Sequence, residues 1–224
     1  MALYHAGMLK RSYRANYSPC YGPCVPRLKQ KTRMNLPILT EIASCTLCSG
    51  KLPYAPRPVL VANSKARLLI VGQAPGRRVQ ESGIPWSDAS GKQLRTWLDL
   101  PPDVFYDPEK VAILPMGFCY PGTGRQGDLP PRPECAPMWH ARLLALMPQI
   151  RLTLLIGAYS QAFYLTDTAG RNLTETVANW RAYLPTYFPL PHPSPRNRLW
   201  LRRNPWFDTE VVPVLRKAVQ EVLQ

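Results

Sequence analysis

One histidine lies in a proline-rich stretch near the carboxyl end of the chain. His192 lies between Pro191 and Pro193 in the segment PHPSPRN, residues 191–197. Neighbouring prolines restrict the backbone and hold a ring in one direction. An imidazole held in this way can stabilise negative charge that develops on a departing group. His192 is therefore predicted to be catalytic.

A second stretch, LLIVGQAPGRRVQESGIPWSDASG, occupies residues 68–91. Its four apolar residues predict a buried strand that ends at Gly72, and Pro75 and Gly76 predict a tight loop. Ser90 is predicted to cap a helix over 92–98. A strand, a glycine-containing loop and a helix start together place backbone N–H groups at one end of a sheet. Open α/β folds bind anionic ligands at such a position.

Four cysteines beyond residue 33 form a third group. Cys45, Cys48, Cys119 and Cys135 have the spacing C-x2-C-x70-C-x15-C. A close pair with two distant thiols favours a four-thiolate site over two disulfides. The spacing does not choose between zinc and a [4Fe–4S] cluster. Cys20 and Cys24 are assigned no role.

Charge indicates the class of partner. The chain has 224 residues and carries 28 Lys and Arg against 14 Asp and Glu, a net charge of +14. Such an excess favours a polyanion, with nucleic acid ahead of a membrane surface. No apolar run reaches the ~20 residues of a membrane helix. The expected protein is a cytoplasmic monomer that binds DNA, with no protein partner implied.

The first 33 residues differ from the rest, with seven basic and no acidic residues and no amphipathic period. They are predicted to form a disordered basic arm, 1–33, before one α/β domain, 34–224. Without the arm the domain still carries 21 basic and 14 acidic residues. Its basic character therefore does not depend on the arm.

The elements that must position these groups alternate along the chain. Apolar runs predict strands over 67–71, 111–118, 152–157 and 187–191. Helices are expected over 36–46, 91–100, 137–147, 159–165, 173–183 and 205–223. This order predicts a three-layer α/β sandwich with a mostly parallel four-stranded sheet. Right-handed crossovers would bring the loops after the first, second and fourth strands to one edge.

Taken together, the motifs resemble the uracil-DNA glycosylase superfamily over residues 35–224. GQAPG, residues 72–76, stands where the iron–sulfur branch carries GEAPG, and Gly83-Ile84-Pro85-Trp86…Gly91 follows that branch's G-x-P-F…G. HPSPRN is closest in wording to the closing motif of the single-strand-selective branch. The resemblance implies the fold of that superfamily, a DNA glycosylase activity and a [4Fe–4S] cluster on the four cysteines.

The resemblance also implies roles for individual residues. Gln73 and Ala74 would face the base, and Trp86 would stack on it, although core packing is an equal alternative for Trp86. His192 would lie against a carbonyl oxygen of the base. The loop that enters the minor groove and contacts phosphates would contain Ser194, Arg196, Asn197 and Arg198.

Three positions depart from the family pattern. Ala74 stands where some branches carry an Asp or Asn that activates water. Asp88 replaces a glycine and is predicted either to activate water or recognise the base, or to cap a helix. Pro115 stands where the branch carries the Asn that reads the edge of uracil, so the base itself stays open.

Three readings of the function follow from these departures. The first is a glycosylase for uracil or an oxidised or deaminated relative. The second is a glycosylase for a bulky hypermodified base of viral DNA, as in antiphage defence. The third is a non-catalytic iron–sulfur DNA-binding module.

Overall fold

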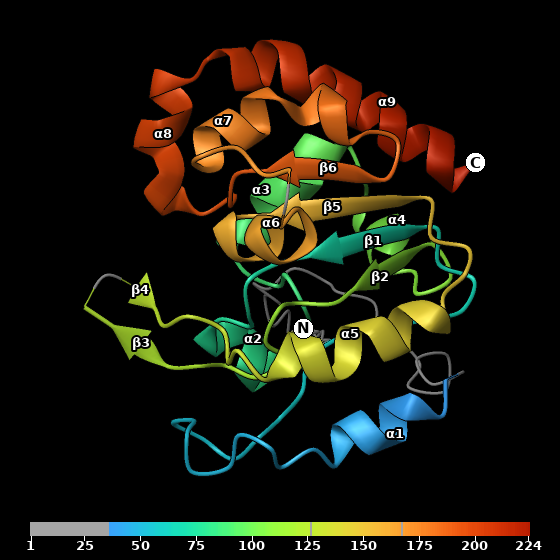
Figure 1. The fold of residues 1–224 in the computed structure, drawn as a ribbon, viewed down its shortest axis with the longest axis vertical. Helices are drawn as coiled ribbons and strands as arrows, with labels where there is room; N and C mark the ends of the chain where they lie inside the picture. Colours follow the sequence, from blue (N-terminus) through green and yellow to red (C-terminus); the bar gives the residue numbers. More distant parts are fainter. Residues whose placement is uncertain (1–35, 126, 167) are drawn as a thin grey trace, which may run out of the picture.

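A parallel sheet of four strands forms the centre of the computed structural model, which describes residues 36–125, 127–166 and 168–224. The predicted arm, 1–33, lies outside the described residues. The strand order is β2-β1-β5-β6, and every neighbouring pair is parallel. The strands are β1 (Leu68–Val71), β2 (Val111–Ile113), β5 (Leu152–Ile156) and β6 (Tyr187–Leu190). Their carboxyl ends therefore lie at one edge, on the left in Figure 1.

Helices cover both faces of the sheet and complete the predicted three layers (Figure 1). They are α1 (Ile38–Ala43), α2 (Arg77–Ser82), α3 (Ala89–Leu98), α4 (Pro102–Phe105), α5 (Cys135–Ala145), α6 (Ala158–Tyr164), α7 (Leu173–Ala178), α8 (Arg198–Arg203) and α9 (Val212–Leu223). No helix in these described ranges is long and apolar enough to cross a membrane.

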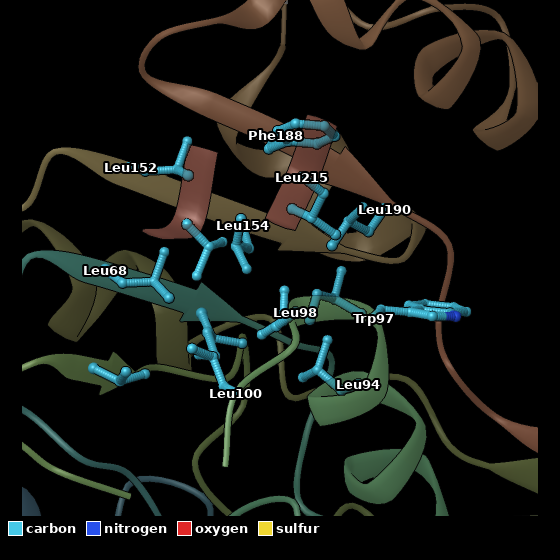
Figure 2. Packing of buried hydrophobic residues seen from close by; sticks show 14 of the residues in the cluster. Leu68, Leu94, Trp97, Leu98, Leu100, Leu152, Leu154, Phe188, Leu190 and Leu215 are labelled. Carbon is cyan, nitrogen blue, oxygen red and sulfur yellow. The ribbon is translucent and has the colours of Figure 1, made fainter. Parts of the chain in front are cut away.

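The side chains of β1 point alternately to the two faces of the sheet, and each face has its own hydrophobic cluster. Leu68 and Ile70 pack with α3, α7 and α9, and Figure 2 shows Leu68, Leu94, Leu98 and Leu154 in this cluster. Leu69 and Val71 belong to the opposite cluster, with α1 and α5. Because strand side chains alternate between the two faces, a continuous apolar strand buries both faces of the sheet. The apolar runs in the sequence arise from this burial.

Several predicted boundaries were wrong where packing overrides a local pattern. β2 ends at Ile113. Leu114 N still donates to Ile70 O of β1 (3.0 Å), Pro115 has no N–H, and the following residues donate to the first motif loop, from Met116 N to Gly72 O (2.8 Å) and from Gly117 N to Gln73 O (3.0 Å). The closing helix begins as a π-helical turn, η4 (Phe207–Val211), before α9. The predicted 173–183 helix is α7 followed by a 3₁₀ turn, η2 (Trp180–Tyr183).

Three short helices, α2, α4 and α8, and a hairpin were not predicted. α2 has one buried apolar residue, Val79, and α8 has no buried residue, so neither shows an amphipathic stripe. Within the expected loop 119–135, β3 (Thr123–Gly124) pairs antiparallel with β4 (Gly127–Asp128). In Figure 1 this hairpin lies at the same edge as the carboxyl ends of the strands.

The cap of α3 is Asp88, as the alternative prediction for that residue had it, and not Ser90. The N-cap is Asp88, and its Oδ1 accepts a hydrogen bond from Gly91 N at 2.9 Å. Ser90, the predicted cap, is a buried residue inside the first turn. An aspartate satisfies an otherwise unpaired N–H of the first turn and also favours the positive end of the helix dipole.

Candidate active site and cysteine cavity

A pocket of about 340 Å³ lies at the carboxyl edge of the sheet. That volume is within the usual range for small-molecule sites. The structure brings these predicted site residues to its wall: Gln73, Ala74, Trp86, Asp88, Pro115, His192, Ser194 and Arg196. The first motif loop and the PHPSPRN segment thus face one space, although they are far apart in the sequence. Asn197 and Arg198 do not line it.

Trp86 is held in place by two glycines and by its own carbonyl group. A methyl group at Gly72 would lie 2.8 Å from the Trp86 ring, and one at Gly91 would lie 1.8 Å from the Trp86 carbonyl oxygen. That oxygen accepts hydrogen bonds from Arg95 Nη1 and the Tyr106 hydroxyl, both at 3.1 Å. The residue adopts a φ of 55°, which is uncommon outside glycine. These contacts explain how the ring can pack against the core and line the pocket at the same time.

His192 lies beside this ring, with centroids 5.6 Å apart and planes tilted by 34°. Its carbonyl oxygen accepts a hydrogen bond from Asn197 Nδ2 at 2.8 Å, so Asn197 holds the loop from within. Burial lowers the pKa of His192 below its usual value, while the carboxylates of Asp88 and Asp128 oppose that shift. The imidazole is therefore neutral at neutral pH and keeps one N–H to donate.

Asp128 is a pocket residue that the sequence reasoning missed. It lies in a Gly- and Pro-rich loop and belongs to no motif. The one available signal was composition, because Asp128 and Glu134 are the only acidic residues between Cys119 and Cys135. Arg78, at the start of α2, also lines the pocket and was not predicted.

A buried histidine supports the wall behind Pro115. His140 Nε2 is 3.1 Å from the Pro115 carbonyl oxygen, and its Nδ1 is 2.7 Å from the Tyr164 hydroxyl. The ring also stacks on Phe118. Burial lowers the pKa of His140 to about 4. His140 thus fixes the pocket wall from behind and does not face the pocket.

This shift predicts a pH dependence of folding. Since the folded state disfavours the charged ring, the contribution of His140 to stability is complete above pH 6.5, its ordinary value, and is lost as the pH falls toward about 4. Urea unfolding of the parent and of His140→Phe at several pH values tests this. The parent should lose its advantage over the variant as the pH falls through this window. Parallel curves for the two proteins would contradict the assignment.

The four predicted cysteine ligands line one cavity beside α5. Cys45 and Cys48 follow α1, and Cys135 is the first residue of α5. Cys119 lies in the connection between β2 and β3. All four are free thiols. The rest of the wall is largely apolar, with Phe118 and Trp139 among its residues and Arg132 at its side.

Burial raises the pKa of the Cys119 thiol to about 11 and that of Cys135 to about 12. It also raises the pKa of Cys48, which the charge of Arg132 opposes. Four thiolates in one cavity, two of them buried and two half-buried, would be unfavourable without a cation, whereas a bound cation stabilises them. Among the described residues, no group of three or more His, Cys, Asp or Glu side chains has the arrangement that holds a single metal ion. The donor set, four thiols in an apolar cavity, fits the chemistry of an iron–sulfur cluster.

Comparison with known proteins connects this geometry to a family. Residues 60–216 match the family model "Uracil DNA glycosylase superfamily". A type-4 uracil-DNA glycosylase of Sulfurisphaera tokodaii is 27% identical over 171 residues, which cover 70% of this chain and 73% of that protein. A type-4 uracil-DNA glycosylase of Archaeoglobus fulgidus is 30% identical over 129 residues, 56% of this chain and 61% of that protein. The family match includes all four strands and both motif loops, and the chain therefore belongs to the uracil-DNA glycosylase superfamily.

Proposed function

We propose that this protein is a monofunctional DNA glycosylase that hydrolyses the N-glycosidic bond of a base flipped out of DNA. The observation that carries the proposal is the single pocket in which Trp86 and a neutral His192 lie side by side. A base must leave the stack to reach such a pocket, and an aromatic ring gives it a new stacking surface. Cleavage would leave an abasic site.

The expected chemistry follows from the charge that develops during cleavage. As the bond to the sugar breaks, negative charge moves onto the base and positive charge onto the sugar. The neutral imidazole of His192 would donate its N–H to the carbonyl oxygen of the base, and the backbone of Gln73 and Ala74 would face the same base. A fixed donor of this kind lowers the barrier because it needs no reorganisation as the charge forms.

The names of the relatives support uracil as the first candidate base. One observation favours a bulkier modified base as the second. Pro115 lines the pocket where the family's Asn reads uracil, and proline has neither an amide side chain nor an N–H. Without that side chain, the pocket lacks one uracil-specific contact and has more room for a substituent.

A base-release assay on DNA containing uracil, hypoxanthine, hydroxymethyluracil or glycosylated hydroxymethylcytosine tests both candidates. Release of uracil supports the first, and release of the glycosylated base alone supports the second. Specific DNA binding with no release of any base would favour a non-catalytic module instead.

The cysteine cavity is proposed to hold a [4Fe–4S] cluster, with zinc as the alternative. Support comes from the four free thiols in one cavity and from the type-4 relatives, which belong to the branch that the cysteine spacing resembles. Cys45, Cys48, Cys119 and Cys135 would be the ligands. The cluster would have a structural role, because it would link the segment after α1 to the 119–135 segment. No redox role is proposed for it. Reduced thiols and a DNA substrate support a cytoplasmic protein.

Arg196→Ala is expected to weaken DNA binding without slowing cleavage of bound DNA. Arg196 is an exposed residue at the pocket rim, where a cation contacts phosphate and supplies affinity with no base specificity. The dependence of the binding constant on salt should become shallower by about one ion. Single-turnover rates at saturating DNA, with binding measured over a range of salt, check this.

Arg171→Ala is the matched control for Arg196→Ala. Arg171 is exposed and pairs with Glu175 at 3.2 Å, away from the pocket. A loss of saturated rate in Arg196→Ala, or an equal loss of affinity in both variants, would contradict the assignment of Arg196.

A further inference from the structure

Some branches of the superfamily carry, at the position of Ala74, an Asp or Asn that activates the attacking water, and this chain, like the iron–sulfur branch, has no carboxylate there. We propose that Asp128, on the β3–β4 hairpin, supplies this carboxylate from a different part of the chain. The inference rests on the proposed glycosylase function. Asp128 and Ala74 line the same pocket, together with His192.

The first observation is the position of the Asp128 carboxylate against the first motif loop. A methyl group at Gly76 would lie 3.5 Å from Asp128 Oδ2. Gly76 is two residues beyond Ala74 in the GQAPG loop. The carboxylate therefore reaches the loop in which some branches carry a water-activating residue, although it comes from a segment more than 50 residues later in the chain.

The second observation is that several contacts position the hairpin. Thr123 Oγ1 donates to Asp128 Oδ1 at 3.4 Å, and Gln73 Nε2 donates to the Leu129 carbonyl oxygen at 3.1 Å. On the other side, a methyl group at Gly127 would lie 1.9 Å from Arg196 Nη1, so the glycine permits the guanidinium group to approach. The hairpin thus contacts both motif loops, and Cys119 and Cys135 lie at the two ends of its segment.

The third observation separates Asp128 from Asp88, the other pocket carboxylate. Asp88 Oδ1 accepts from Gly91 N, so this side chain holds the start of α3. One oxygen of the Asp88 carboxylate is therefore occupied by a structural contact. Among the described residues, the Asp128 carboxylate accepts a long hydrogen bond from a hydroxyl group on its own hairpin and caps no helix. Asp88 stays a candidate for contact with the base.

The step that we assign to Asp128 is proton transfer. The water oxygen forms a bond to the anomeric carbon of the sugar while the bond from that carbon to the base nitrogen breaks. The electron pair of the broken bond leaves with the base, where His192 stabilises it. The water proton moves to the Asp128 carboxylate and then to solvent, and the base is protonated from solvent after release.

Asp128→Asn is the test, because asparagine keeps an oxygen that can accept from Thr123 but cannot take the proton. We expect the single-turnover rate to fall about 100-fold, within the usual range for a general base. DNA affinity should stay equal or rise, because a negative charge near the DNA is removed.

Glu109→Gln is the control with the same charge change. Glu109 pairs with Lys65 at 3.1 Å and lies two residues before β2, at the opposite edge of the sheet. This variant should match the parent in single-turnover rate. The single-turnover rate of Asp88→Asn, measured in parallel, tests whether the other pocket carboxylate activates the water instead.

The outcomes separate the inference from the function on which it rests. If the parent releases none of the four bases, the proposed function fails. If the parent is active and Asp128→Asn cleaves at the same rate, only the assignment of Asp128 fails. A fall in the saturated rate of Asp88→Asn but not of Asp128→Asn would transfer the role to Asp88. A fall in DNA affinity with an unchanged saturated rate would make Asp128 a docking residue.

Discussion

His192→Ala is expected to lower the single-turnover rate of base release by about 10²–10³-fold, the usual loss for one donor that stabilises a developing anion. The pocket holds the ring beside Trp86, and burial keeps it neutral, so its N–H is available to the departing base. DNA affinity should change little, since affinity depends mainly on phosphate contacts. Single-turnover kinetics at saturating DNA, with affinity measured separately, check this.

His192→Gln is the matched variant, because glutamine keeps an N–H donor without an imidazole ring. It should recover part of the rate that alanine loses. A parent-like rate for His192→Ala on the true base would overturn the role. If His192→Ala lost DNA affinity but kept the parent rate at saturating DNA, His192 would be a docking residue.

Cys119→Ser is expected to remove bound iron and sharply reduce the yield of soluble protein. Cys119 and Cys135 lie at the two ends of a segment rich in glycine and proline, which has little regular structure to hold it. Without the anchor, this segment loses the restraint that a metal site places on folding. Iron content, the absorbance of anaerobically purified protein at about 400 nm, and thermal unfolding check the result.

Cys20→Ser is the control, since Cys20 has no assigned role. It should retain the iron, colour and melting temperature of the parent. Colourless parent protein with stoichiometric zinc would overturn the cluster. Retention of iron and solubility by Cys119→Ser would show that this residue is not a ligand.

The sequence by itself determined the layers of the fold and most of the pocket. Parallel strands buried on both faces must be continuously apolar, so 68–71 and 152–156 could be recognised as strands from composition alone. Because parallel strands end at one edge, the GQAPG and HPSPRN loops could be placed together before any coordinates. The four cysteines could be grouped as one site because their number and their spacing can be read directly from the sequence.

Only the tertiary structure decided which carboxylates reach the pocket. Asp88 follows a motif and was predicted, but its bond to Gly91 depends on where α3 begins. Asp128 lies in a hairpin that contacts Gln73 through Leu129 and Arg196 through Gly127. Contacts between residues so far apart in sequence leave no periodicity along the chain, because they depend on how separate segments pack. For that reason the place of Asp128 in the pocket follows from the tertiary structure and not from the sequence.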